Sequence, residues 1–197
     1  MGRPSKPIIS KELAAKAALS VIDSHGISGM SLQLVAQRLG VKAPSLYYHF
    51  ENKAELLRDV ARYVLLEAGI SEDQHFGDWR EALIVLALSI RKSIFEHPRA
   101  APLLLEFFPR HLMLQTYEYW IGKVDLPMEK RMLIVDGVEK LTFGSAMLGA
   151  MSRANGNDPM PPFAPEQFPH LHAATTANNL NETDLFVATL RAFLNSF

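Results

Sequence analysis

Apolar residues recur every three or four positions along most of this 197-residue chain, which is the spacing of one face of an α-helix. No stretch alternates apolar and polar residues with the period of a β-strand. The first third contains four helical segments, over residues 10–25, 31–39, 44–50 and 52–65, and each begins with a residue that favours a helix start. The pattern predicts an all-α fold that opens with short helices.

Longer helical segments follow a polar connection at residues 69–77. The same spacing predicts helices over residues 78–96, 99–106, 110–123, 128–151, 166–178 and 182–196. Five prolines between residues 154 and 170 predict a long irregular loop. We expect about nine to ten helices in two domains, a small one at residues 1–55 and a larger one at residues 56–197.

The second and third segments are separated by a turn of only a few residues after Gly40. Glycine tolerates the left-handed conformation that ends a helix, and Pro44 loses nothing at a first helical position, where the N–H group has no partner. Ala36 is small enough to let the two helices cross closely. This spacing indicates a helix-turn-helix, in which the second helix enters a DNA major groove.

Charge is distributed unevenly along the chain. The formal net charge is −1, but residues 1–53 carry +4 and the remainder −5. A basic end suits contact with phosphates, although a solvated helix face gives the same count by chance. The chain has no cysteine, no apolar run long enough for a membrane span and no secretory signal, so we expect a cytoplasmic protein without disulfides or thiolate metal sites.

Polar and aromatic residues cover the exposed face expected for the third segment. The hydroxyls and the imidazole of Ser45, Tyr47, Tyr48 and His49 can reach phosphates or base edges. The alternative is an aromatic cluster packed inside an ordinary helical bundle. The basic arm with Arg3 and Lys6 either follows the minor groove or has no fixed structure.

The stretch from Leu39 to Lys53, LGVKAPSLYYHFENK, resembles the signature of the TetR family of transcriptional repressors. The resemblance is strong over residues 10–60 and implies that Leu46 and Phe50 belong to the core. It also implies a set of DNA-contacting residues, namely Ser31, Gln33, Lys42, Ala43, Pro44, Ser45, Tyr47, Tyr48, His49 and Lys53.

The larger domain resembles the tetracycline repressor branch of that family in its helix order. The resemblance implies a homodimer in which the helices at 128–151 and 182–196 form a four-helix bundle with their copies. The expected interface residues are Val135, Val138, Leu141, Ser145, Leu148, Leu185, Thr189 and Phe193. The alternative is that both helices build only the core of one protomer.

The resemblance also implies an effector pocket in the larger domain, although for each candidate residue taken alone plain core is the favoured interpretation. The candidates are Leu86, Ile90, Phe95, Leu103, Leu105, Phe108, Tyr117, Trp120, Phe143 and Met147. At Leu86, Ile90 and Leu103 this chain lacks the groups that hold magnesium and tetracycline in that branch. We therefore expect an apolar or aromatic effector, no metal and no cofactor.

These expectations describe a regulator that binds palindromic operator DNA and is released by a small molecule. A transcriptional activator or a ligand-independent DNA-binding protein on the same fold is the alternative. We do not expect an enzyme, because no phosphate-binding loop or nucleophile elbow occurs and the acids and histidines have no catalytic spacing. His170 and His172 lack a third metal ligand nearby.

Overall fold

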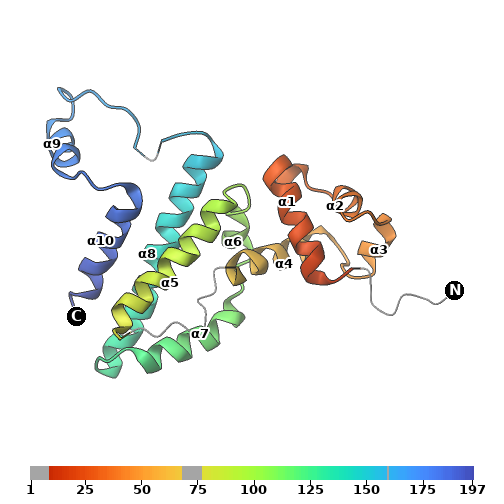
Figure 1. Ribbon diagram of the computed structural model, residues 1–197, viewed down its shortest axis with the longest axis horizontal. Coiled ribbons are helices and arrows are strands. Elements are labelled where there is room, and N and C mark those ends of the chain that lie inside the picture. Colours follow the sequence, from red (N-terminus) through yellow and green to blue (C-terminus); the bar gives the residue numbers. More distant parts are fainter. Residues whose placement is uncertain (1–8, 68–76, 159) are drawn as a thin grey trace.

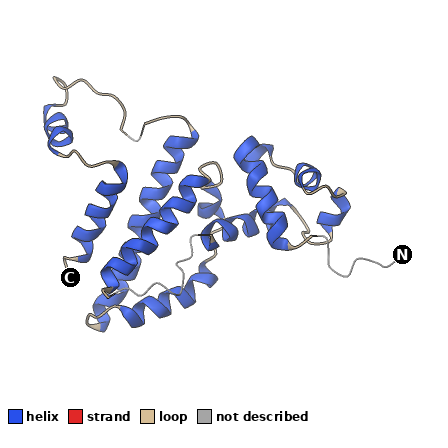
Figure 2. Ribbon diagram, viewed as in Figure 1, coloured by secondary structure: helices blue, strands red, loops and turns tan. Residues whose placement is uncertain are grey.

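The chain is built from α-helices alone, as Figures 1 and 2 show. The computed structural model describes residues 9–67, 77–158 and 160–197, so the arm with Arg3 and Lys6 and most of the polar connection lie outside the described residues. Within these ranges the helices are α1 (Lys11–Gly29), α2 (Leu32–Arg38), α3 (Ala43–Tyr47), α4 (Lys53–Leu66), α5 (Trp79–Glu96), α6 (Pro102–Glu106), α7 (Arg110–Lys123), α8 (Met128–Ala154), α9 (Pro169–Ala177) and α10 (Glu182–Leu194). The all-α prediction is confirmed.

Several helix boundaries differ from the predicted ones. Helix α3 ends at Tyr47 rather than Phe50, because Phe50 turns into the core and Asn52 already caps α4. Helix α6 begins only at Pro102, since turns occupy the residues after His97. Helix α4 runs through the predicted domain boundary at residue 55 and packs along α1.

The helices form two hydrophobic cores. The first joins α1 to α4 and continues into α6 and one end of α8; Leu46 and Phe50 are fully buried in it. The second lies among α5, α7, α8 and α10. In Figure 1, α1 to α3 lie at one end of the molecule and α10 at the other, with α4 leading from one part to the next. No helix in the described ranges is long and apolar enough to cross a membrane.

Gly40 closes α2 in the way that the sequence predicts. Its φ is +67°, the amide of Gly40 donates to the carbonyl of Gln37 at 3.1 Å, and the amide of Val41 donates to that of Ala36 at 3.0 Å. This pair of bonds is a Schellman motif, and it fixes the angle at which the chain enters α3. Ala36 is 2% exposed, so the two helices cross closely there.

Gly40→Ala is expected to lower the free energy of unfolding by about 1 kcal/mol, because a side chain resists positive φ. No atom lies within 4 Å of the added Cβ, so the loss comes from the backbone alone. The matched control is Gly122→Ala in α7, where the space is also open and φ is ordinary. There we expect a gain of about 0.5 kcal/mol. Urea unfolding of both variants measures the difference, and equal effects would contradict the strain at Gly40.

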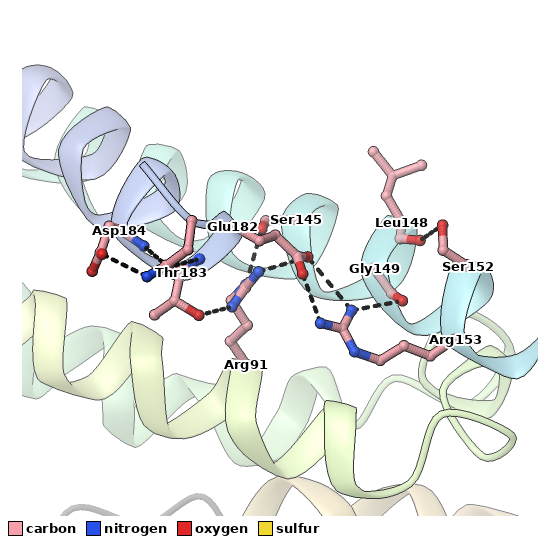
Figure 3. A network of polar contacts seen from close by, with 10 residues as sticks. Arg91, Ser145, Leu148, Gly149, Ser152, Arg153, Glu182, Thr183 and Asp184 are labelled. Atoms are coloured by element: carbon pink, nitrogen blue, oxygen red, sulfur yellow. Dashed lines mark hydrogen bonds and ion pairs between the residues drawn. The ribbon is translucent and has the colours of Figure 1, made fainter. Parts of the chain in front are cut away.

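Helix α10 is fixed to α5 and α8 by an ionic network around the buried Arg91, shown in Figure 3. The side chain of Arg91 is 3% exposed, and its Nη2 lies 2.8 Å from Oε1 of Glu182 at the start of α10. Arg153 Nη2, from the end of α8, lies 2.6 Å from the other oxygen of Glu182. Both guanidinium groups also lie over the ring of Phe95, at 4.2 and 3.8 Å from its centroid. The carboxylate therefore joins three helices.

Glycine lowers the stability of a helix, so its presence in α8 suggests that neighbouring groups need the space beside it. Two of the three glycines of α8 have this packing role. A Cβ at Gly137 would meet the ring of Phe193, and a Cβ at Gly149 would meet Phe95 and Glu182. Gly144 differs, since nothing lies within 4 Å of its Cβ position and the residue is exposed. Within the single chain, no neighbouring group requires a glycine at position 144.

Candidate functional site

The exposed face of α3 carries the polar and aromatic residues that the sequence places there. Tyr47 is 56% exposed and Tyr48, at the end of the helix, 89% exposed. The ring of Tyr48 meets that of His49 edge to face, with centroids 5.4 Å apart. Of the other α3 candidates, Lys42, Pro44 and Ser45 are exposed and Ala43 is half-buried. An apolar cluster inside a bundle is excluded for Tyr47 and Tyr48.

Ser31 and Gln33 lie at the start of α2. Ser31 is the N-cap, and its Oγ accepts a hydrogen bond from the amide of Leu34 at 3.2 Å. The hydroxyl proton is not used in this bond, so it can be donated to an acceptor outside the protein. Gln33 is exposed. Both residues keep the capacity for a phosphate or base contact.

Lys53 has a structural role that sequence reasoning missed. Its ammonium donates to the carbonyls of Ile27 and Met30 at 2.9 and 2.7 Å. These bonds tie the start of α4 to the turn between α1 and α2. A lysine ammonium has three protons, so one remains for a phosphate. The residue positions the helix-turn-helix whether or not it also contacts DNA.

The basic residues of this part of the chain differ in how free they are. Lys11 is paired with Glu55 at 2.7 Å, which leaves Lys16, Arg38 and Lys42 as the exposed cations of residues 9–52 that form no ion pair within the described part of the chain. Arg38, in the last turn of α2, is not among the DNA-contacting residues predicted from the sequence. Its exposed position beside Gly40 is the signal that identifies it as an additional phosphate-binding candidate.

A group of polar contacts connects the helix-turn-helix to the rest of the protein. Nδ1 of His97, which ends α5, lies 2.8 Å from a carboxylate oxygen of Asp23 in α1, and Nε2 lies 3.6 Å from Glu67. Arg99 Nη1 donates to the carbonyls of Asp23 and Ser24 at 3.1 and 3.0 Å. The end of α1 is therefore attached to the loop that follows α5. The contacts with Asp23 and Ser24 join residues more than 70 positions apart, so no local signal predicts them.

A cavity of about 40 Å³ lies between α5, α7 and α8. Its lining residues are Leu83, Leu86, Ala87, Ile90, Met113, Thr116, Tyr117, Trp120, Val135, Val138, Glu139, Thr142 and Phe143. Five of the predicted pocket residues are among them. The space holds one or two water molecules, so a larger ligand has to displace side chains such as Met113.

The remaining predicted pocket residues do not line this cavity. Leu105 is 74% exposed on α6, whereas Leu103 and Met147 are buried in the first core beside α4. Phe95 packs under the two arginines described above. Phe108 lies behind Phe143, with its ring edge to face at 5.1 Å. Leu103 and Leu105 lie on α6, which does not border the gap between α5, α7 and α8, and Phe108 lies in the connection from α6 to α7. Phe95 and Met147 lie on α5 and α8 but are not among the side chains that line the gap.

The cavity has a polar end on α8. The side chain of Thr142 is buried, and its Oγ1 has no hydrogen-bond partner within the described part of the chain. The hydroxyl of Tyr117 donates to Glu139. Burial, followed by this hydrogen bond, raises the pKa of Tyr117 to about 12, so the phenol stays protonated.

The outer face of α8 and α10 carries exposed small and apolar residues. Leu148 is 71% exposed and Leu185 45% exposed, and Thr189 is exposed as well. The other predicted interface residues are buried or half-buried within the single chain. Val135 and Val138 line the cavity, Leu141 is half-buried, Ser145 accepts from Arg91, and Phe193 packs on Gly137 and Phe197.

The metal site considered for His170 and His172 gains no further ligands. No group of three or more potential metal ligands occurs among residues 9–67, 77–158 and 160–197. His170 and His172 lie two positions apart on α9, so they project from different sides of the helix.

Comparison with known proteins identifies the N-terminal part. Residues 15–60 match the family model described as bacterial regulatory proteins, tetR family. The class A tetracycline repressor protein of Escherichia coli is 37% identical over 83 residues, which cover 42% of this chain and 38% of that relative. The match thus spans less than half of its length.

Two longer alignments extend the likeness to the remainder of the chain. The class E tetracycline repressor protein of E. coli is 26% identical over 168 residues, or 81% of this chain and 79% of the relative. The transcriptional regulator SCO7222 of Streptomyces coelicolor has the same fold, with a TM-score of 0.76 at 20% identity over 95% of this chain and 97% of the other. The match over residues 15–60 assigns the N-terminal helices, with the exposed face of α3, to the tetR family of bacterial regulatory proteins, and the whole chain shares the fold of the SCO7222 regulator.

Proposed function

We propose that this protein is a transcriptional repressor that binds palindromic operator DNA as a homodimer. The observation that carries the proposal is the exposed face of α3, where Tyr47, Tyr48, Ser45 and Lys42 stand on a frame fixed by Gly40 and Lys53. Hydroxyl and ammonium groups suit phosphates and base edges, and the rigid frame holds them in one register. The relatives named above are themselves called repressors.

The proposed dimer uses the outer face of α8 and α10. Leu148 and Leu185 supply apolar area, and Gly144 has room for close approach by a second copy. One recognition helix covers few base pairs, so a dimer that reads two half-sites explains specific binding. DNA as the partner also places the protein in the cytoplasm.

Release by a small, largely apolar or aromatic ligand is the regulatory part of the proposal. The cavity between α5, α7 and α8 is smaller than a typical ligand, so binding has to displace side chains between these helices, and we expect α5 to move with them. The end of α5 holds α1 through His97 and the neighbouring Arg99. Movement of α5 would therefore also move the helix-turn-helix. This supports a ligand-dependent change between two states of the dimer that differ in the distance between their recognition helices.

Selection of binding sequences from random double-stranded DNA tests the proposal. We expect recovered sites with two inverted half-sites, and higher transcription from a promoter bearing such a site when the protein is absent. Lower transcription in its absence would contradict repression, and the absence of any enriched sequence would contradict operator binding.

Tyr48→Ala and Lys42→Ala are expected to weaken binding to the selected site about 10-fold each while the protein stays folded. If Lys42 contacts a phosphate, its loss also reduces the slope of log affinity against log salt by about 0.9. The matched control is Lys130→Ala, an exposed lysine on α8. Fluorescence anisotropy at several salt concentrations measures both effects, and parental affinity in both variants would show that α3 is not the recognition helix.

A further inference from the structure

The polar end of the cavity carries one acidic group and no basic one. Its lining residues include Glu139 but no lysine, arginine or histidine. No ion pair to Glu139 occurs within the described residues; the neighbouring Asp136 is already paired with Lys140 at 2.5 Å. Arg110 of α7 is close enough to act on Tyr117 electrostatically but does not line the cavity. The charge that a ligand meets there is negative.

Thr142 lies three residues after Glu139 on α8, so the two side chains are neighbours on the helix surface. The buried hydroxyl of Thr142 has no partner in the described structure, although an unsatisfied buried polar group is costly. The protonated hydroxyl of Tyr117 donates a hydrogen bond to Oε2 of Glu139 and so uses part of the acceptor capacity of that carboxylate. A ligand with N–H groups can use the remaining acceptor capacity of Glu139 together with the Thr142 hydroxyl.

We propose that this cavity takes a largely apolar amine, held by Glu139 and Thr142, and that it excludes carboxylates. The apolar walls from α5 and the indole of Trp120 surround the hydrocarbon part of the ligand. A carboxylate would meet the like charge of Glu139, which repels it. The inference rests on the proposed ligand-responsive function and names the chemical class of its ligand.

Three aromatic probes of similar size test this choice: benzylamine, benzyl alcohol and benzoate at neutral pH. Binding is followed by the indole N–H signal of Trp120 in ¹H–¹⁵N NMR spectra, with that of Trp79, outside the cavity, as an internal reference. We expect benzylamine to bind at least about 10-fold more tightly than benzoate, with benzyl alcohol between them.

Two variants identify the groups responsible. Glu139→Gln is expected to weaken benzylamine about 10-fold and to leave benzyl alcohol within about 3-fold, and Thr142→Val to weaken benzylamine about 3-fold or more. Glu129→Gln, an exposed acid at the start of α8, is the matched control and changes neither.

Equal or tighter binding of benzoate, or a preference unchanged by Glu139→Gln, would overturn the proposal. So would the failure of all three probes to shift the Trp120 signal. Operator binding measured on the same protein separates this failure from failure of the proposed function. If the protein binds its operator but not the amine, the ligand proposal fails and the proposed DNA-binding function stands. If it binds the amine but no DNA, the proposed function fails and the ligand proposal stands.

Discussion

Glu182→Gln is expected to lower the free energy of unfolding by about 3 kcal/mol. The carboxylate lies between Arg91 and Arg153, and Arg91 is almost completely buried. Glutamine keeps the shape but removes the negative charge, which leaves a buried guanidinium beside a second one. Hydrogen bonds from Arg91 to Ser145 and Thr183 remain, yet neither partner is charged. Urea unfolding of the variant and the parent measures the loss.

The matched control is Glu81→Gln. Glu81 pairs with Arg191 of α10 at 2.9 Å, in the same chemistry and between two of the same helices, but both side chains are about half exposed. Water screens such a pair, so we expect a change below about 0.5 kcal/mol. Equal losses in the two variants would show that the burial of Arg91 does not determine the effect.

The same network makes stability depend on acid pH. The hydrogen bond from Arg153 is the largest influence on Glu182 and lowers its pKa from the ordinary value of 4.5, with burial acting in the opposite direction. A carboxyl group whose pKa is lower in the folded state stabilises the protein above its unfolded pKa. This contribution is lost as the pH falls from about 4.5 through the folded pKa. Glu182→Gln should remove that part of the pH dependence.

The N-terminal helices could be predicted from the sequence because their signals are local. Ser31 and Asn52 cap their helices with their own side chains, and Gly40 has the positive φ that its position suggested. Pro44 marked the start of α3 to within one residue. Each signal acts over four or five positions, so it can be recognised in the sequence without knowledge of the tertiary structure.

The faces of the long helix α8 could not be predicted in the same way. The expected interface residues Val135, Val138 and Leu141 follow one another in steps of three residues. Three residues fall about 60° short of a full helical turn, so each residue lies about 60° further around the helix than the one before. Such a stripe begins in the core and reaches the surface only at Leu148, as the structure shows. The ion pair of Arg91 with Glu182 was missed for a different reason, since it joins residues 91 positions apart.

Leu148→Glu is expected to convert the proposed dimer to monomers and to reduce affinity for a palindromic site about 100-fold or more. Leu148 is the most exposed large apolar residue of α8 and is separated by one turn from Gly144. At a two-fold interface the substitution places two carboxylates, one from each copy, in an apolar contact where neither has a cation. Sedimentation velocity at micromolar concentration and DNA binding measure the two effects.

Leu114→Glu makes the same chemical change on the exposed side of α7, where the leucine is 65% exposed. Since α7 is outside the proposed interface, this control should remain dimeric and bind DNA as the parent does. A Leu148→Glu protein that stays dimeric would rule out the face of α8 and α10 as the interface. A monomeric protein with undiminished operator affinity would instead separate DNA recognition from dimer formation, because one copy of α3 would then suffice for the site.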